Sequence, residues 1–474
     1  MKRLKQGLLG RIRRIHLVGI GGAGMSAIAE VLLNNGLKVS GSDLCASDVT
    51  ERLKERGAIV AIGHEAKNIE GAEVVAHSSA VRVDENPETL EAKRLGVPIV
   101  KRDELLGEIM RRKAGICVAG THGKTTTTTM IATMLAECNL EPTALIGGVS
   151  DYFLNVGFGG SALVGDGDWM VIEADEYDRA FLKLTPTIAV MTTLEAEHLD
   201  IYRDIEDLKN AFAEFANKVP FYGAIVLCDD EEGLRALRPN LKRKVVGYGL
   251  NPDAEFRATD IEQEKTSTTF KVLRRGKSLG VVGLQTLGLH NVKNALAAIA
   301  VGFEIGLDFE DIRRGLEKFR SVRRRFQIRF QNGEDAPVVI DDYAHHPTEV
   351  RATLEAARSG FKTRPVVAVF QPHLYSRTRD FAKDFAKALS LADRAIIADI
   401  YPARERAEAF KGVTSELIAR EMTNATLAEK DALLQTLTRE IRGNEVVVMM
   451  GAGDITKIAE SFAEELRKRN ANAV

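Results

Sequence analysis

Short apolar runs alternate with helical patterns through the first hundred or so residues. RIHLVGI is followed by glycines and SAIAEVLLNNG, and the alternation continues through LKVSGSD, AEVVAHSSAV and VPIVKRDELL. Apolar runs separated by helical patterns predict a parallel sheet with crossover helices. We therefore expect a Rossmann-like domain over residues 1–110.

The alternation restarts at GICVAG, which runs into a polar loop and the helical pattern TTTTTMIATMLAEC. DWMVIEAD and PTIAVMTT are predicted as buried strands, whereas FRATDIEQ, STTFKVLRR and KSLGVVGLQ indicate antiparallel strands. GLHNVKNALAAIAVGFEIG and FEDIRRGLEKF return to helix. A central P-loop ATPase-type α/β domain with an antiparallel strand region is expected over residues 111–320.

A third alternation begins near Ser321. Four apolar runs, APVVIDDYA, RPVVAVFQPH, DRAIIADI and NEVVVMMGAG, each end in a polar or glycine-rich group. Ligands of open α/β sheets bind beyond the carboxyl ends of the strands, so these groups mark an expected site. The predicted fold class is α/β with three domains in series, the last being Rossmann-like over residues 321–474.

Composition narrows the class of protein. The 474 residues exceed one ordinary core, and 45% hydrophobic with 28% charged residues is typical of a globular protein. A net charge of −2, with Lys and Arg spread along the chain, argues against nucleic acid or an anionic membrane as the main partner. The basic start MKRLKQGLLGRIRR has too short an apolar piece for a signal peptide, which predicts a cytoplasmic location.

The four cysteines carry no metal-binding or disulfide pattern. Cys45, Cys117, Cys138 and Cys228 are scattered without a C-x-x-C pair. Buried reduced thiols are the expected state of all four.

The first glycine turn, Gly19–Gly24, fits G-x-G-x-x-G and precedes a predicted helix. Backbone N–H groups at a helix N-terminus bind a diphosphate. A dinucleotide with Asp43 on a ribose hydroxyl is one interpretation, and a turn used only for packing is the other. Ser78 and Ser79 end another strand and would add hydroxyl donors.

The stretch VAGTHGKTTTTTM predicts a phosphate loop. Gly120 and Gly123 allow successive N–H groups to turn toward phosphate oxygens. Lys124 would reach the β- and γ-phosphates, and Thr125 would place its hydroxyl on Mg²⁺. The strict motif needs glycine at position 118, where this chain has Val118.

An acidic partner for this loop follows the run WMVIEAD. Glu173 at the strand end is the expected Mg²⁺ ligand, whereas Asp175 and Glu176 fit solvated acids better. His198 follows the next strand. It is either a ligand of a second divalent ion or a structural histidine.

Two further groups suggest nucleotide contacts. Asn291 and Asn294 are one helical turn apart and could bracket a purine edge, although capping explains one of them. The run Arg323–Arg325 is either solvated or supplies a hinge arginine to the γ-phosphate.

Histidines and acids gather beyond the strand ends of the third domain. The residues are Asp341, Asp342, His345, His346, His373 and Arg377. The set includes a guanidinium, and its histidines and acids lack the i,i+4 spacing of helical metal ligands. Both features favour a site for a small carboxylate-bearing substrate over a metal site.

The ordered set of motifs resembles the Mur ligase family, the ATP-dependent amino-acid ligases of peptidoglycan precursor synthesis. The motifs are HLVGIGGAGMSAIAEVL, SGSD, SSAV, GTHGKTTT, EADEYDRAFL, LEAEHLDIY, GLHNVKNALAA, RRRF, DDYAHHPTEV, QPHLYSRTRD, DIYPARE and MGAGD. They cover nearly the whole chain. The family's phosphate loop lacks the early glycine, so Val118 fits it. Leu374 stands where the family often has arginine, and Tyr177 where it usually has serine.

The resemblance implies a set of site residues. A UDP-sugar would bind at Gly21, Gly22, Ala23, Gly24, Ser42, Asp43, His64, Ser78 and Ser79. ATP would bind at Gly120, Thr121, His122, Gly123, Lys124, Thr125, Thr126, His290, Asn291, Asn294, Arg325 and Asp342. Mg²⁺ or Mn²⁺ would bind at Thr125, Glu173 and His198, and the amino acid at Tyr343, His345, His373 and Arg377. Catalysis would fall to Lys124, His198, Arg325 and His345.

The implied activity is ATP-dependent joining of L-alanine to the lactyl carboxylate of UDP-N-acetylmuramate through an acyl phosphate, by a monomer or homodimer. Three alternatives stay open. One is a relative that attaches a preformed tripeptide to the same sugar nucleotide. The others are an NAD-dependent oxidoreductase built on the glycine turn and a regulatory NTPase switch.

Overall fold

Three β-sheets form the framework of the chain. The computed structural model describes residues 8–195 and 201–471. The chain divides into two compact units, unit 1 (residues 1–259, 271–282 and 293–320) and unit 2 (residues 260–270, 283–292 and 321–474). The α/β class predicted from the sequence is confirmed. The domain boundaries after residues 110 and 320 stay a prediction.

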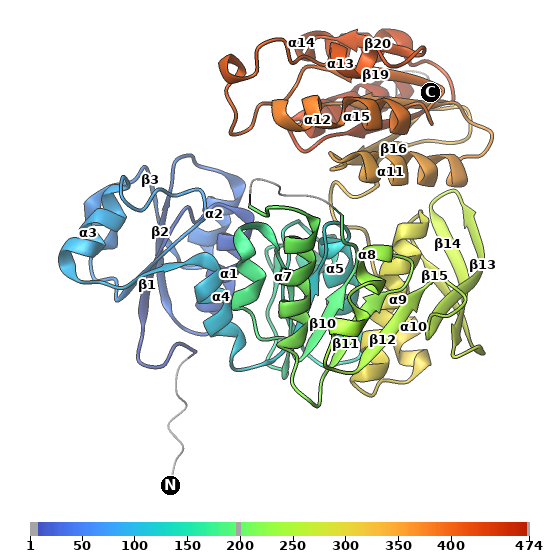
Figure 1. The fold of residues 1–474 in the computed structure, drawn as a ribbon. Coiled ribbons are helices and arrows are strands. Elements are labelled where there is room, and N and C mark those ends of the chain that lie inside the picture. The colour runs from blue at the N-terminus through green and yellow to red at the C-terminus, as the bar shows by residue number, and fades with distance from the viewer. Residues whose placement is uncertain (1–7, 196–200, 472–474) are drawn as a thin grey trace. The chain divides into compact units, whose positions relative to one another are not determined.

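The first sheet is parallel, with strand order β3-β2-β1-β4-β5 (Figure 1). Its elements are β1 (Arg14–Val18), α1 (Ala23–Asn34), β2 (Lys38–Asp43), α2 (Asp48–Glu55), β3 (Ile59–Ile62), 3-10 helix η1 (Ala66–Ile69), β4 (Val74–His77), α3 (Pro87–Leu95), β5 (Ile99–Lys101) and α4 (Arg102–Met110). Val18 is in register with Ser42 on one side and His77 on the other. The carboxyl ends of β1, β2 and β4 therefore meet at one edge, where the glycine turn begins.

The second sheet has ten strands in the order β15-β14-β13-β12-β11-β10-β6-β9-β7-β8. Its elements are β6 (Ala114–Ala119), α5 (Lys124–Glu137), β7 (Thr143–Leu145), α6 (Asp151–Asn155), β8 (Ala162–Leu163), β9 (Trp169–Ala174), η2 (Tyr177–Lys183), β10 (Ile188–Met191), α7 (Ile205–Asn217), β11 (Ala224–Cys228), α8 (Glu232–Arg235), η3 (Arg238–Asn240), β12 (Val245–Gly249), β13 (Phe256–Glu264), β14 (Ser267–Arg274), β15 (Lys277–Leu284), α9 (Leu289–Glu304) and α10 (Phe309–Glu317). Strand β6 lies between β9 and β10, with Val118 paired to Glu173 and Ala119 to Met191. This register brings the phosphate loop to the same edge as Glu173.

Strands β13, β14 and β15 form the predicted antiparallel region. Consecutive strands are joined by the two-residue turns Lys265-Thr266 and Arg275-Gly276. Lys265, Arg275 and Gly276 have φ of 53°, 49° and 77°. Positive φ in a two-residue loop is the geometry of a tight hairpin, which joins antiparallel neighbours.

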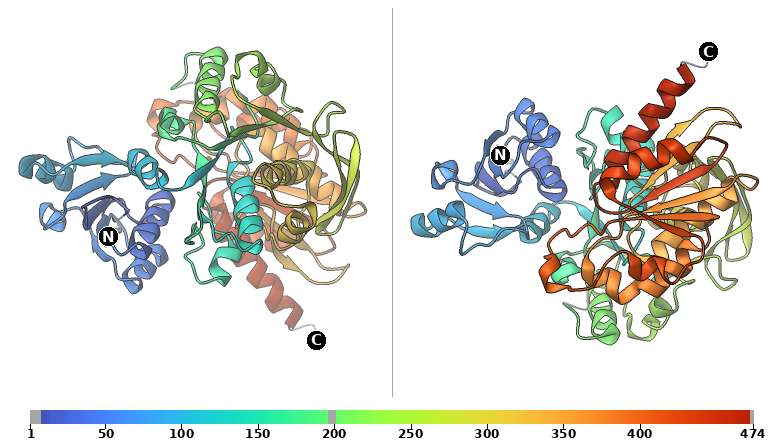
Figure 2. Two further views of the ribbon diagram at one scale, coloured as in Figure 1. Left: turned by 90° about the horizontal axis from the view of Figure 1, so that it is seen from below. Right: turned by 90° about the horizontal axis from the view of Figure 1, so that it is seen from above.

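The third sheet has the order β16-β17-β21-β18-β19-β20, parallel except for the antiparallel pair of β16 and β17. Its elements are β16 (Gln327–Gln331), β17 (Val338–Asp342), α11 (Pro347–Gly360), β18 (Val366–Phe370), α12 (Tyr375–Leu389), β19 (Arg394–Ala398), η4 (Ala407–Ala409), α13 (Glu416–Ala419), β20 (Ala425–Ala428), α14 (Lys430–Glu440), β21 (Val446–Met450) and α15 (Ile455–Ala471). Figure 2 shows α15 running from this sheet to the C-terminus.

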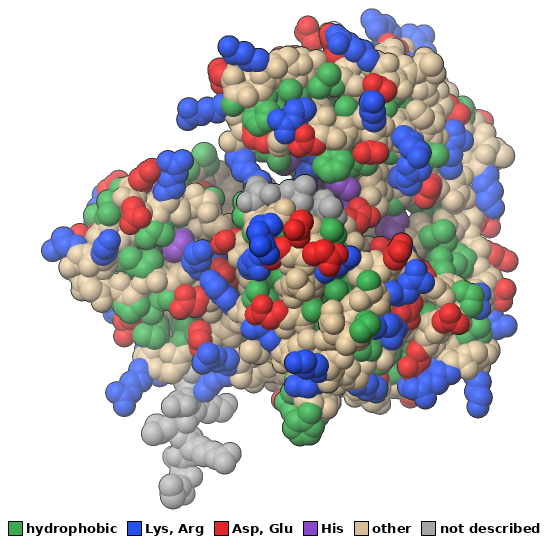
Figure 3. Space-filling view, in the orientation of Figure 1, with side chains coloured by type: hydrophobic (Ala, Val, Ile, Leu, Met, Phe, Trp, Pro, Cys, Tyr) green, Lys and Arg blue, Asp and Glu red, His purple; other side chains and the backbone are tan. Residues whose placement is uncertain are grey.

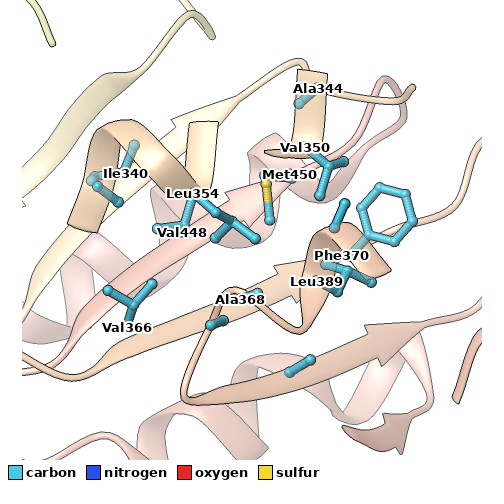
Figure 4. Packing of buried hydrophobic residues seen from close by; sticks show 14 of the residues in the cluster. Ile340, Ala344, Val350, Leu354, Val366, Ala368, Phe370, Leu389, Val448 and Met450 are labelled. Carbon is cyan, nitrogen blue, oxygen red and sulfur yellow. The ribbon is translucent and has the colours of Figure 1, made fainter. Parts of the chain in front are cut away.

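The core of unit 2 fixes the strand ends that carry polar residues. Ile340, Val448 and Met450 from the sheet pack with Val350 and Leu354 of α11 (Figure 4). All five are fully buried. Each such side chain contributes about 1.5–3 kcal/mol when removed from water, so the ends of β17 and β21 are held firmly.

The surface carries mixed charges. Lys and Arg side chains are interspersed with Asp and Glu on the face seen in Figure 3. None of the helices in residues 8–195 and 201–471 combines the length and apolar character that a membrane span requires. Burial is confirmed for Cys117 and Cys228, whereas Cys138 is half-buried and the prediction was wrong for Cys45, which is exposed on the loop between β2 and α2.

Candidate active site

A cavity of about 670 Å³ lies at the carboxyl edge of the first sheet. Five of the nine predicted UDP-sugar residues line it: Gly21, Gly22, Asp43, His64 and Ser78. The other four are outside the lining. Ala23 and Gly24 form the first turn of α1, Ser42 is buried, and Ser79 is exposed.

The glycine turn is fastened to β2. Ser42 O accepts hydrogen bonds from Gly19 N at 2.8 Å and Ile20 N at 3.0 Å. Asp43 Oδ2 accepts from Gly21 N at 2.8 Å. A Cβ atom at Gly21 would lie 2.9 Å from that carboxylate oxygen, so a larger residue there would displace the Asp43 side chain. Asp43 thus anchors the turn, a role that the ribose interpretation did not foresee.

Several residues of the cavity wall were missed from the sequence. Cys45, Arg82 and Asn86 line the cavity. Arg82 pairs with Glu85 on the surface, at 3.1 Å, and supplies a cation near the glycine turn. The run SSAVR could have indicated Arg82, because this basic residue follows the strand-end serines by a few positions.

The phosphate loop needs both of its glycines. Gly120 and Gly123 have φ of 144° and 84°. A Cβ atom at Gly120 would lie 2.1 Å from Thr192 Oγ1, and one at Gly123 would lie 2.9 Å from Asn294 Oδ1. The loop is therefore packed against the end of β10 and against α9.

Two threonines hold this loop, and neither was predicted from the sequence. Thr193 Oγ1 accepts from His122 N at 2.7 Å and lies 2.9 Å from Thr121 Oγ1. Thr192 Oγ1 donates to His122 O at 2.5 Å. They follow β10, a neighbour of β6 in space but far from it in sequence. Thr126, at the start of α5, is buried.

Lys124 is held by Glu176, which corrects the interpretation of Glu176 as a solvated acid. Glu176 is fully buried, and its carboxylate oxygens lie 3.0 and 2.9 Å from Lys124 Nζ. Burial lowers the pKa of Lys124, but Glu176, Asp175 and Glu173 raise it more, so the pKa lies above its usual value. Gly120 O also accepts from Lys124 Nζ, at 2.5 Å. The ammonium group therefore stays charged beside the loop.

Thr125 and Glu173 offer an oxygen pair for a divalent cation. Thr125 Oγ1 donates to Glu173 Oε2 at 2.9 Å, and Gly147 N donates to the other carboxylate oxygen. Hydroxyl and carboxylate oxygens are the donors that Mg²⁺ prefers. The residues therefore fit the predicted ion. His198, the other predicted ligand, lies outside the described residues.

The asparagines of α9 have different surroundings. Asn291 Nδ2 donates to Leu287 O at 2.7 Å and Thr286 Oγ1 at 3.2 Å. Asn294 faces the phosphate loop at Gly123. His290 is half-buried at the start of the same helix. Their assignment to ATP stays a prediction, with Asn294 the member that the structure brings to the loop.

Asp342 is buried at the end of β17. Its carboxylate accepts from Phe326 N at 2.6 Å and Ala344 N at 2.7 Å. Burial raises the pKa of Asp342 to about 6, although Arg325 and the two backbone donors lower it. The carboxylate ties the segment before β16 to the loop after β17, and so orients Arg325.

Two arginines flank the ring of Tyr343. The guanidinium carbons of Arg324 and Arg325 lie 4.7 and 5.1 Å from its centroid. Arg324 Nη2 donates to Gly451 O at 2.6 Å and Gly453 O at 3.0 Å. Arg325 has a longer contact, 3.7 Å, to Glu349. Arg324 thus has a structural role, whereas Arg325 is less tightly held.

A row of aromatic rings brings predicted amino-acid residues together. Tyr343, His345 and His373 are neighbours, with centroids 5.2 and 5.8 Å apart. His373 stacks on Tyr401 at 5.9 Å. Burial lowers the pKa of His373 to about 4, with smaller contributions from His345, Arg377 and Arg404. His373 is therefore neutral at neutral pH. Tyr401 was missed as a member of this site.

Arg377 and Leu374 lie at the start of α12. Nη1 of Arg377 is buried and has no hydrogen-bond partner among the described residues, which suits a group awaiting a carboxylate. Leu374 adopts φ 70° and ψ 137° and donates its N–H to Tyr401 O at 3.0 Å. It is buried, so it does not supply the charge that the family often has there.

Two polar residues of the third domain serve the fold. Asp341 is fully buried, and its Oδ2 accepts from Arg329 Nη2 and Thr456 Oγ1, both at 2.7 Å. His346 caps α11 by accepting from Thr348 N at 3.4 Å. These contacts leave His345 and His373 as the histidines of the aromatic row.

Family models match the chain in three consecutive segments. Residues 14–114 match the Mur ligase family, catalytic domain; residues 118–302 match the Mur ligase middle domain; and residues 324–453 match the Mur ligase, glutamate ligase domain. Together they span most of the chain, in the order that the motifs predict.

Individual relatives agree with these matches. The chain is 52% identical to the UDP-N-acetylmuramate–L-alanine ligase of Chlorobaculum tepidum over 98% of each chain, and 53% identical to that of Chlorobaculum parvum over 96% of this chain and 97% of the relative. A crystal structure of UDP-N-acetylmuramate-alanine ligase from Thermotoga maritima matches with a TM-score of 0.81 and 31% identity, covering 96% of this chain and 99% of that one. A murein peptide ligase from Psychrobacter arcticus shares the fold, with a TM-score of 0.69 and 24% identity. The chain belongs to the Mur ligase family.

Proposed function

We propose that the protein is an ATP-dependent ligase that joins L-alanine to the lactyl carboxylate of UDP-N-acetylmuramate. The observation that carries the proposal is 52% identity, over 98% of each chain, to a ligase of that name. The sites described above fit the three substrates. The first-sheet cavity suits a sugar nucleotide, the phosphate loop suits ATP, and the aromatic row with Arg377 suits a small amino acid.

The chemistry requires activation of the acid. A carboxylate does not condense with an amine in water at neutral pH, because its leaving group is poor. The lactyl carboxylate attacks the γ-phosphorus of ATP, which gives an acyl phosphate and ADP. The free amine of L-alanine then attacks the acyl carbon, inorganic phosphate leaves, and an amide remains.

The described residues supply charge and position for these steps. Lys124 keeps its charge beside the loop and offsets the negative charge of the transferring phosphoryl group. Thr125 and Glu173 would hold Mg²⁺ or Mn²⁺, which supplies Lewis-acid stabilisation of phosphate oxygens when bound. Assignment of Arg325, Asp342 and His345 to catalysis or ATP binding is part of the proposal.

Specific observations disfavour the alternatives. An NAD-dependent oxidoreductase would have no use for the phosphate loop. A regulatory NTPase switch would have no use for the first cavity. The tripeptide-adding activity is represented by two ligase structures, at 24% identity over 96% of this chain and 30% identity over 66% of it. Both are below the 52% identity, over 98% of the chain, to an L-alanine ligase. A cytoplasmic location is part of the proposal. A monomer or a homodimer would serve it equally.

A phosphate-release assay with ATP, UDP-N-acetylmuramate and a panel of free amino acids tests the function. We expect release to require both the sugar nucleotide and L-alanine, and the preformed tripeptide to be a poor substitute. Release with the tripeptide but not with L-alanine would overturn the assignment. Oxygen-18 in the lactyl carboxylate is expected to reach the released phosphate, which reports the acyl phosphate.

A further inference from the structure

A buried carboxylate lies behind the wall of the first cavity and has no part in the chemistry above. Glu88, in the first turn of α3, is fully buried. Its Oε2 accepts from Ser42 Oγ at 2.6 Å, and its Oε1 accepts from Asn68 Nδ2 at 2.6 Å. Two imidazoles approach the same Oε2, His64 Nδ1 at 3.4 Å and His16 Nε2 at 3.5 Å. Four side chains therefore converge on one acid.

Glu88 is ionised in this setting. Burial by itself would raise the pKa of Glu88, but the contact with His16 and the hydrogen bonds from Ser42 and Asn68 together hold it below its usual value. The position at the start of a helix also favours a negative charge. An ionised carboxylate only accepts hydrogen bonds. The hydroxyl of Ser42, at 2.6 Å, must therefore donate its one proton to Glu88.

Because Ser42 donates its proton to Glu88, the direction of the hydrogen bond between Ser42 and His64 is determined. Ser42 Oγ lies 2.9 Å from His64 Nδ1. With its proton given to Glu88, the hydroxyl oxygen acts as the acceptor here, so Nδ1 of His64 carries the hydrogen. In its neutral form an imidazole has one N–H group, so in that form Nε2, on the far side of the ring, is a bare acceptor. His64 is part of the cavity lining, with 15% of its side chain exposed.

We propose that Glu88, acting through Ser42, fixes His64 as the Nδ1–H tautomer, so that its Nε2 accepts a hydrogen bond from a hydroxyl or the imide N–H of the bound uridine. This inference deepens the proposed function and rests on it. Diphosphate oxygens are acceptors only, so the bare nitrogen selects the nucleoside part of the ligand instead. Glu88 is a positioning residue, because it is buried behind the wall and touches no substrate.

Nitrogen-15 spectra of the histidine rings in the ligand-free full chain test the tautomer directly. The chain has nine histidines, and His64→Gln identifies the pair of signals that belongs to position 64. We expect Nδ1 of His64 to resonate as a protonated nitrogen and Nε2 as an unprotonated one. The opposite pattern would overturn the proposal. Because no ligand is present, this result is independent of what the cavity binds.

Calorimetry with UDP tests the consequence for binding. In Glu88→Gln the carboxamide can donate as well as accept, so the proton order is lost; we expect about tenfold weaker UDP binding and unchanged ATP binding. The control is Glu91→Gln on the same helix, since the partly exposed Glu91 pairs with Arg94 at 2.7 Å and with no other side chain among the described residues. Wild-type affinity in Glu88→Gln would overturn the proposal. If that variant fails to fold, Ser42→Ala removes the same link, with the same expectation and the same overturning result.

Three analogues identify the donor: 2′-deoxy-UDP, 3′-deoxy-UDP and N3-methyl-UDP. The analogue that lacks the contacted donor should bind wild type and Glu88→Gln equally, whereas the other two should retain the tenfold difference. Retention of the full difference by all three would overturn the contact. Failure of wild type to bind UDP would contradict the assignment of the cavity, a separate outcome that the ligand-free spectra distinguish from failure of the tautomer.

Discussion

Two glycine-rich loops in unit 1 share a backbone design and differ in their side chains. The turn Gly19–Gly24 and the loop Gly120–Thr125 each leave a parallel strand and open a helix. In the first, the Asp43 carboxylate accepts a hydrogen bond from the backbone N–H of Gly21 and so anchors the turn. The second contains a lysine whose ammonium group is paired with a buried carboxylate, Glu176.

The difference corresponds to different chemical demands. A bound diphosphate that does not react needs donors and shape, which the glycine turn and the hydroxyl-lined wall provide. A phosphoryl group in transfer needs a positive charge placed beforehand, which the second loop provides. The same strand–turn–helix unit thus binds a ligand at the first loop and supports phosphoryl transfer at the second.

The comparison is tested most strongly by Lys124→Ala. We expect phosphate release to fall by about a thousandfold or more, because the charge beside the γ-phosphate is lost. The dissociation constant for UDP, measured by calorimetry, should stay within twofold of wild type, because Lys124 belongs to the second loop and UDP is assigned to the first. Lys209→Ala, on the surface of α7, is the control. Weakened UDP binding with intact ATP binding would reverse the assignment of the two loops.

Glu173→Gln tests the metal pair of the second loop. The carboxamide keeps the shape but removes the charge that attracts a divalent ion, so we expect about a hundredfold higher Mg²⁺ requirement in the phosphate-release assay. Asp43→Asn, at the first loop, should leave the Mg²⁺ requirement unchanged. An unchanged requirement in Glu173→Gln would show that the ion does not bind at this pair.

Glu176→Gln tests the pairing of Lys124 in the nucleotide-free protein. Removal of the buried acid leaves the ammonium group without its carboxylate, so we expect a loss of about 2 kcal/mol in the free energy of unfolding. ATP supplies the missing negative charge. The rise in melting temperature on adding ATP should therefore be larger in the variant than in wild type. Glu137→Gln, on the exposed end of α5, should change neither quantity. Equal ATP-induced shifts in Glu176→Gln and wild type would contradict the pairing.

Cys45 allows the two ligands to be separated in unmodified protein. It is exposed and lines the first cavity, whereas Cys117 and Cys228 are buried, and burial raises the pKa of Cys138 to about 11. Alkylation should therefore be fastest at Cys45. UDP at ten times its dissociation constant should slow this reaction about tenfold by occupancy, and ATP should not. Peptide mass spectrometry follows the modification, and protection by ATP instead of UDP would count against the assignment of the cavity.

Much of the framework could be predicted because its signals are local. Apolar runs predicted the strands, and the motif around Gly120 and Lys124 predicted a loop between a strand and a helix, which the structure has. Glu173 was also predicted correctly as the acid beside Thr125, since a strand-end position directs its side chain to the loop.

What was missed depends on how the chain returns in space. Glu176 is buried because the chain turns sharply after β9, where Asp178 and Arg179 have φ of 53° and 54°. Thr193 reaches the phosphate loop from another strand. Glu88 meets Ser42 across a separation of 46 residues. Such contacts leave no periodic pattern, and a local window cannot distinguish them from surface polar residues.

The backbone at Leu374 combines local strain with burial. A non-glycine residue at φ 70° and ψ 137° carries strain of about 1–3 kcal/mol. Glycine there would relieve this strain, yet it would remove a buried side chain, at a cost of about 2–5 kcal/mol, and would loosen the joint that orients His373 and Arg377. The strained leucine is therefore the cheaper solution for stability as well as for the orientation of the two side chains.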